Sequence, residues 1–176
     1  MERLYYREDQ SFRQSFVIWI ILAAWLLLIG VTAYGFYQQL YLGRPYGDEP
    51  SSNSGLLWSG IGTILLVSAV FILLLNSILV TEIWSDGIRY KFSPFIHKLK
   101  HVPLSDIASA EVGKYRPLAE FGGWGWRTRI FRRKTAYNIS GRIGLRIMKK
   151  NGYQLVLGTQ HEEEMKRAVS KMMQKN

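Results

Sequence analysis

The sequence predicts an α+β protein, in which two transmembrane helices form a hairpin and are followed by a domain of short strands and one C-terminal helix. The first observation is that residues 14–43 and 50–81 carry no Asp, Glu, Lys or Arg. The second is that, beyond residue 81, apolar and polar residues alternate in short runs, as on strands with one wet face. The third is an amphipathic stretch near the C-terminus.

The two apolar stretches are each long enough to cross a bilayer, which takes about 20 residues of helix. We assign the spans to residues 16–37 and 56–80, with a loop at 38–55 between them. Residues 1–15 form an N-terminal segment and residues 81–176 a separate domain. A cleaved signal peptide is the competing interpretation of the first span, but its apolar run is too long for one. We therefore expect a retained anchor.

The orientation follows from the positive charges near the ends of the spans. Arginines precede the first span and basic residues follow the second, whereas Arg44 is the only one in the loop. Both termini are therefore predicted to be cytoplasmic, in a multi-pass protein of the cell (inner) membrane. The net charge of +10 is concentrated in residues 81–176, which hold 19 lysines and arginines against 8 acidic residues.

A few small or polar side chains mark positions in the second span that can contact another helix. Gly55, Ser59 and Thr63 recur at intervals of four, a spacing that lets helices approach closely. The alternative is a stripe that simply faces lipid. Asn76 lies near the cytoplasmic end of the span, where an interhelical hydrogen bond is favoured over transport. Neither span holds a charged residue, which argues for anchors rather than an ion pathway.

After the spans, turn signals predict a series of strands and hairpins. Residues 85–87 form a turn between strands at 81–84 and 88–92, and Asn151-Gly152 predicts a type I′ hairpin. Further strands are expected at 96–102, 107–112, 144–149 and 153–159. The C-terminal helix begins at a predicted capping box of Thr159 and Glu162. Its apolar stripe is formed by Met165, Ala168, Val169, Met172 and Met173.

Two motifs carry a resemblance to a known family. Residues 96–107 read IHKLKHVPLSDI, and residues 121–126 (FGGWGW) precede TAYNISG at 135–141. The first resembles the "IPLSDI" signature of bacterial membrane-linked pleckstrin-homology-like proteins. The second resembles the GGWG…AYN.SG pattern of a two-span subgroup. The resemblance implies an antiparallel β-sandwich or barrel closed at one end by the C-terminal helix. It implies no activity, because function on this fold belongs to individual sites.

The segment 113–134 combines glycines, aromatic rings and cations, and we expect it to be an irregular loop of functional importance. Trp and basic residues together suit the headgroup layer of an anionic membrane. The alternative is that a Trp fills the core of the domain. The residues predicted to contact the membrane or a partner are Trp124, Trp126, Arg127, Arg129, Arg132, Arg133 and Lys134.

No pattern in the sequence predicts catalysis, a cofactor or a metal. Cysteine is absent, which excludes thiol chemistry and disulfides. His97 and His101 lie on a predicted strand, where a spacing of four does not make a zinc pair. The Gly123-x-Gly125 pattern lacks the third glycine of a dinucleotide site. The basic charge is explained by an anionic membrane with fewer assumptions than by nucleic acid.

The sequence thus predicts a non-enzymatic adaptor that is integral to the lipid bilayer. Its domain is expected to recognise anionic lipid headgroups, a protein partner or a second copy of itself. The alternative is an accessory subunit of a membrane enzyme or transporter, contacted through Gly55, Ser59, Thr63 and Asn76.

Overall fold

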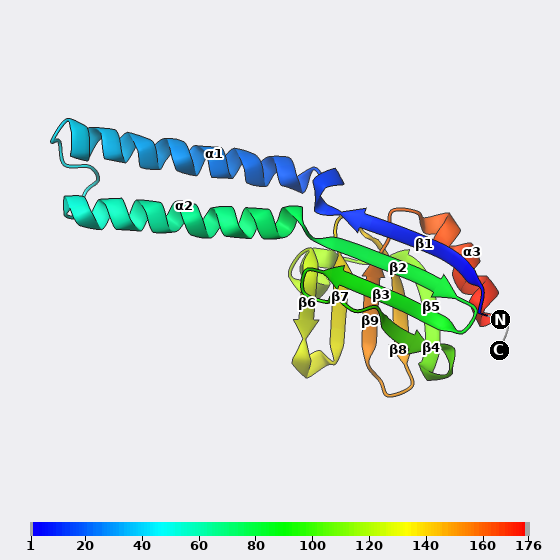
Figure 1. Cartoon of the computed structure of the whole chain (residues 1–176). Coiled ribbons are helices and arrows are strands. Elements are labelled where there is room, and N and C mark those ends of the chain that lie inside the picture. Colours follow the sequence, from blue (N-terminus) through cyan, green and yellow to red (C-terminus); the bar gives the residue numbers. More distant parts are fainter. Residues whose placement is uncertain (1, 175–176) are drawn as a thin grey trace. The chain divides into compact units, whose positions relative to one another are not determined.

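The computed structural model describes residues 2–174, and the chain forms two compact units (Figure 1). One unit is the helical hairpin of residues 16–75. The other combines the first 15 residues with the chain from Asn76 onward. The domain is therefore assembled from both sides of the hairpin, and it includes the N-terminal segment that the sequence analysis treated as separate.

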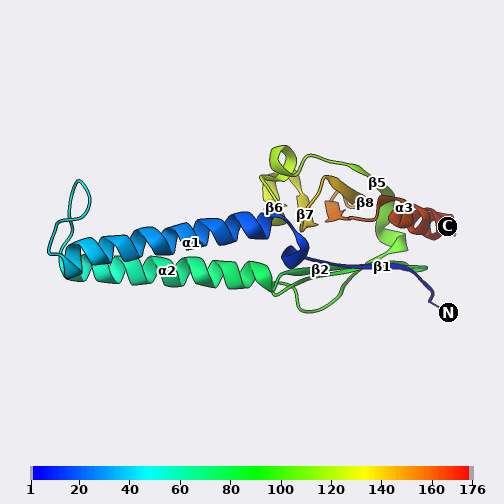
Figure 2. The same ribbon diagram turned by 90° about the horizontal axis from the view of Figure 1, so that it is seen from above.

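The helical unit consists of α1 (Val17–Phe36), a π-helical extension (Tyr37–Tyr41) and α2 (Asn53–Leu75). The helices run side by side in both views (Figures 1 and 2). Trp25 Nε1 donates to Ser68 Oγ at 2.9 Å, and its ring stacks on Phe71. A Cβ added to Gly60 would lie 2.6 Å from the Phe36 ring, so glycine permits this close contact. Both helices are long and apolar enough to span a membrane, and most of their side chains are exposed.

The first sheet has the order β1-β2-β3-β4, with β1 at Leu4–Ser11, β2 at Ile78–Trp84, β3 at Gly87–Ser93 and β4 at Lys100–Pro103. All its pairings are antiparallel. Ser11, at the end of β1, lies opposite Ile78, at the start of β2. The chain thus leaves the first sheet and returns to it at paired positions. The two connections to the helical hairpin therefore start from neighbouring points of the sheet.

The second sheet has the order β5-β8-β9-β7-β6. It contains β5 (Ile107–Lys114), β6 (Gly125–Arg129), β7 (Lys134–Asn138), β8 (Ile143–Lys149) and β9 (Gln154–Gly158). Strands β7 and β9 are parallel, so this sheet is mixed and not entirely antiparallel as the sequence predicted; the other pairings are antiparallel. The expectation of an irregular loop at 113–134 was wrong in part, because this segment contributes to the β6–β7 hairpin.

Helix α3 (Glu162–Met173) packs on strands of both sheets, namely β1, β2, β5 and β8. Four members of its predicted apolar stripe are buried: Met165, Ala168, Val169 and Met172. They complete a core to which the sheets contribute the fully buried Leu79, Ile83, Leu145 and Leu157, among others. The separate layers of the sheets are visible in Figure 2.

The second helix ends earlier than the predicted span of 56–80. Residue Leu75 is its last, and Asn76 lies outside it, where Oδ1 accepts from Arg13 Nη2 at 3.2 Å. Residues 78–80 belong to β2, with Leu79 and Val80 buried in the domain. Hydropathy alone cannot separate the end of an apolar helix from a buried strand that follows directly.

Three local predictions are also corrected. The β8–β9 hairpin forms at Asn151-Gly152, but only Gly152 has a positive φ, so the turn is not type I′. The strand expected at 96–102 is limited to β4. Thr159 does not cap α3, because its hydroxyl donates to Glu8 and accepts from the His161 backbone N–H instead.

Candidate interaction surfaces

The β6–β7 hairpin ends in two exposed apolar side chains. Arg129 pairs with Lys134, and a 3₁₀ turn at Ile130–Arg132 connects the strands. Ile130 is 79% exposed and Phe131 is fully exposed. We call these two residues the tip. Apolar side chains are uncommon at such turns, where polar residues and glycine prevail. The exposed apolar tip is therefore a candidate contact surface.

Three of the predicted contact cations lie next to this tip in the chain, and the other two contact groups within the domain. Arg129, Arg132 and Arg133 flank the tip in the chain, and none of them forms an ion pair within residues 2–174. Arg127 instead turns its Nε toward the Trp124 carbonyl, at 3.0 Å. Lys134 lies 4.8 Å from the centroid of the Phe121 ring, and desolvation lowers its pKa. None of the five cations forms an ion pair within residues 2–174, and the three arginines next to the tip also make no side-chain hydrogen bond to the described residues.

Neither of the two predicted tryptophans is fully buried. Trp124 is half-buried, and its Nε1 donates to the Gly141 carbonyl at 3.0 Å. Trp126 is 47% exposed and stacks on Tyr137 with ring centroids 6.3 Å apart. The ring centroid of the exposed Phe95 lies 5.8 Å from the ring centroid of Trp126. Trp126 and Phe95 therefore form a second apolar surface, farther along the hairpin from the tip.

Ile130 and Phe131 were not among the contact residues predicted from the sequence. The signal was present in Arg-Ile-Phe-Arg-Arg at 129–133, where two large apolar residues interrupt a run of arginines. The signal could be interpreted only once the hairpin was known. Two consecutive side chains of a strand point to opposite faces, whereas in this turn both are exposed.

The predicted helix-contact residues do not act as a group. Gly55, Ser59 and Thr63 are all exposed, and the close approach to α1 is made at Gly60. Contact of the exposed stripe with another chain stays a prediction. Asn76 is not on the helix, and it bonds to Arg13, which belongs to the same compact unit as Asn76.

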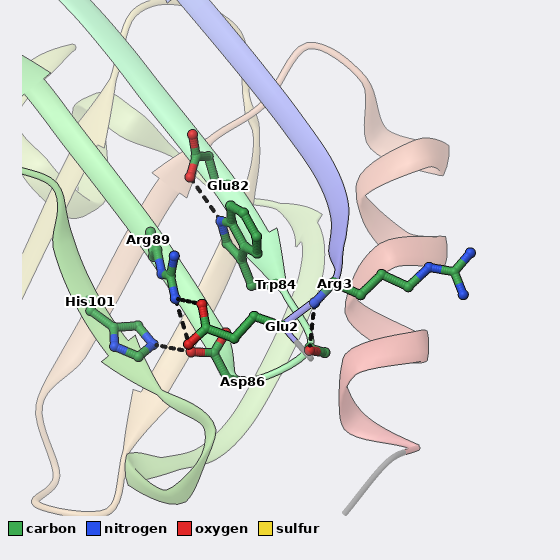
Figure 3. A network of polar contacts seen from close by, with 8 residues as sticks. Glu2, Arg3, Glu82, Trp84, Asp86, Arg89 and His101 are labelled. Atoms are coloured by element: carbon green, nitrogen blue, oxygen red, sulfur yellow. Dashed lines mark hydrogen bonds and ion pairs between the residues drawn. The ribbon is translucent and has the colours of Figure 1, made fainter.

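A polar network joins the N-terminus to the turn between β2 and β3 (Figure 3). Arg89 contacts Glu2 at 2.7 Å and Asp86 at 3.1 Å, and its guanidinium lies 4.5 Å from the Trp84 ring centroid. His101 Nε2 lies 3.4 Å from Asp86. The Arg3 backbone N–H donates to Ser85, at 3.0 Å. This arrangement ties the start of the chain to the sheet.

A second polar cluster is buried between β1 and the start of α3. The Glu8 carboxyl is 6% exposed and accepts from the Tyr6 hydroxyl at 2.7 Å. It also accepts from the Thr159 hydroxyl at 2.7 Å and from the Gln160 backbone N–H at 2.8 Å. Burial and the bond to Glu8 raise the pKa of Tyr6. The cluster joins distant parts of the chain inside the domain, which is a structural role.

Comparisons of the chain with protein-family models, with curated proteins and with solved structures find no match.

Proposed function

We propose that the protein is an integral protein of the bacterial inner membrane, with both termini cytoplasmic, and that its domain is a non-catalytic adaptor at the membrane surface. We further propose that the domain is pleckstrin-homology-like. The antiparallel β1–β4 sheet, the second sheet and the C-terminal helix support this, together with the motifs at 96–107 and 121–141.

The hairpin tip is the observation that carries the membrane-binding role. Burying a side chain such as Ile130 or Phe131 contributes about 1.5–3 kcal/mol. Each arginine near an anionic surface adds about 1 kcal/mol. Arg129, Arg132 and Arg133 have no acidic partner in the described part of the domain, so their charge is free to meet headgroups.

Tethering makes such a modest contact sufficient. The domain is joined to the hairpin at two points, between Ser11 and Val17 and between Leu75 and Ile78. Both connections are short, so the domain stays near the bilayer in which the hairpin is inserted. A tethered contact acts at a high effective concentration and can be occupied although its intrinsic affinity is low.

The proposed topology predicts that a reporter fused after Asn176, which lies outside the described residues, is active in the cytoplasm. Within residues 50–55 this cytoplasmic reporter should be inactive and a periplasmic reporter should be active, because the loop between the spans is exported. Paired cytoplasmic and periplasmic reporters measure both positions. Periplasmic activity at the C-terminus would contradict the topology.

The membrane-binding role predicts that the tip enters anionic bilayers. The chain has no cysteine, so Ile130→Cys introduces a unique position for a spin label in the full-length protein. In nanodiscs containing phosphatidylglycerol, the label should become accessible to oxygen and protected from a water-soluble nickel complex. In phosphatidylcholine discs it should stay in water. Raising the salt to 1 M should reverse insertion, since the Debye length falls to about 3 Å.

Matched variants separate charge from apolar contact. Replacing Arg129, Arg132 and Arg133 by Ser should abolish insertion, whereas replacing the same three by Lys should retain it. A label at Ser170→Cys, on the exposed side of α3, should stay in water in both discs. Equal accessibility of the Ile130→Cys label in neutral and anionic discs would overturn the proposal.

A further inference from the structure

An open cleft of about 480 Å³ lies between the two sheets, on a different part of the domain from the tip. Helix α3 packs on β1, β2, β5 and β8, whereas the cleft is lined mainly from β3, β4, β7, β8 and β9. Its volume falls in the range of small-molecule sites, about 300–1,000 Å³. The lining residues are Tyr90, Lys100, His101, Val102, Thr135, Tyr137, Lys149, Asn151, Tyr153 and Leu155.

Two lysines give the cleft a positive charge. Lys100 lies on the same face of β4 as the buried Val102, and Lys149 on the same face of β8 as the buried Ile147, because strand residues alternate between faces. His101, between Lys100 and Val102, turns its Nε2 to Asp86 instead. No carboxylate lines the cleft, and neither lysine forms an ion pair within residues 2–174.

Three phenols add hydrogen-bond donors and aromatic walls. Tyr90 and Tyr137 pack with ring centroids 5.3 Å apart, and their hydroxyls make no hydrogen bond to the described residues. Tyr153 shares a hydrogen bond with the Thr135 hydroxyl. Burial raises the pKa of Tyr90 to about 12 and raises that of Tyr137 as well, so both phenols are protonated donors at neutral pH.

We propose that this cleft binds a small phosphorylated ligand, with its phosphate at Lys100 and Lys149 and its body against the tyrosine rings. A phosphomonoester carries a charge of about −1.5 to −2 at pH 7 and three acceptor oxygens. It therefore matches two unpaired cations and the neighbouring hydroxyl donors. A monocarboxylate would leave one of the lysines without a counter-charge.

Titration calorimetry of the full-length protein in a neutral detergent tests this site, with phenyl phosphate as the probe. Phenyl phosphate should bind saturably at one site per chain, inorganic phosphate more weakly, and phenol not at all. Lys100→Met and Lys149→Met should each weaken phenyl phosphate binding about tenfold, the effect of losing roughly 1.4 kcal/mol of charge-assisted hydrogen bonding. Lys91→Met is the matched control, because Lys91 lies on the opposite face of β3 from Tyr90 and should leave binding unchanged.

A further variant adds charge with little change in structure. The Asn151 side-chain oxygen accepts from the Tyr153 backbone N–H at 3.0 Å, a bond that Asn151→Asp can retain. The added negative charge in the cleft should weaken phenyl phosphate binding while the melting temperature is preserved. Replacing the three tip arginines by Ser should leave this binding intact, which separates the cleft from the proposed membrane contact.

Nanodiscs identify where the phosphate comes from. If discs containing phosphatidic acid compete with phenyl phosphate, the phosphomonoester is supplied by a lipid headgroup. If they do not compete, it belongs to a soluble molecule, and both results support the site. Absence of saturable phenyl phosphate binding, or equal binding by a folded Lys100→Met/Lys149→Met double variant, would overturn the proposal.

Discussion

Replacing Glu8 by Ala is expected to lower the free energy of unfolding of the domain by about 3 kcal/mol or more. The carboxyl accepts hydrogen bonds from Tyr6, Thr159 and the Gln160 backbone N–H in a buried position. Each buried donor left without a partner costs about 1–3 kcal/mol. Thr159 and Tyr6 can in part reorient their hydroxyls, whereas the Gln160 N–H is fixed by the backbone. The loss of stability is therefore expected near the lower end of the range that three unpaired donors would give.

Thermal unfolding of the full-length protein in detergent, followed by near-ultraviolet circular dichroism, measures this change. Glu111→Ala is the matched control, because Glu111 is an exposed carboxylate on β5. Its effect should stay within about 0.5 kcal/mol. Glu8→Gln retains one acceptor oxygen and should fall between the two variants. If Glu8→Ala and Glu111→Ala melt at the same temperature, the buried cluster does not stabilise the domain as described.

The second large effect is expected for Gly87→Ala, at the turn between β2 and β3. Gly87 has a φ of +150°, and a Cβ added to it would lie 2.3 Å from the Val102 carbonyl oxygen and 2.9 Å from the Pro103 Cα. Both are backbone atoms of β4, which is paired with β3 at this point. Relief requires the strands to separate, so we expect a loss of about 3 kcal/mol, from strain and broken pairing together.

Gly113→Ala provides a control of identical chemistry. Gly113 lies within β5, has no positive φ, and a Cβ there would meet no atom within 4 Å. Alanine at such a site is expected to be neutral or to stabilise by about 0.5 kcal/mol. The difference in melting temperature between the two variants isolates the contact with β4. Equal melting temperatures would show that β4 moves away from the added methyl group without a loss of stability.

The sequence predicted those elements whose pattern is local. The two apolar helices follow from their length, and the β2–β3 and β8–β9 hairpins from glycine-containing turns. Strand β1 was missed because its inward-facing residues include Glu8 and Gln10, which read as solvent-exposed in a pattern based on hydropathy. Their burial depends on hydrogen bonds to Thr159, Gln160 and Gly158, more than 140 residues away in the chain.

The surfaces were harder to predict than the elements. The cations of the β6–β7 hairpin were selected as a group in the sequence, but without the hairpin nothing distinguished Arg132 from Arg127. The structure separates them, since Arg127 bonds to Trp124 whereas Arg132 lies in the turn. The cleft was not predicted at all, because Lys100 and Lys149 approach one cavity only when the two sheets pack together.

The pairing of β1 with β2 has a consequence for biosynthesis. During translation, β1 emerges long before its partner, because the whole helical hairpin separates the two strands. In the proposed topology, the first sheet is therefore complete only after the chain has crossed the bilayer and returned. If α2 failed to insert in a protein with this topology, β2 would remain outside the cytoplasm. Strand β1 would then have no partner for its backbone hydrogen bonds. In this topology the domain would fold only when both helices have inserted correctly. Chains with an uninserted helix would stay unfolded and be open to cellular proteases.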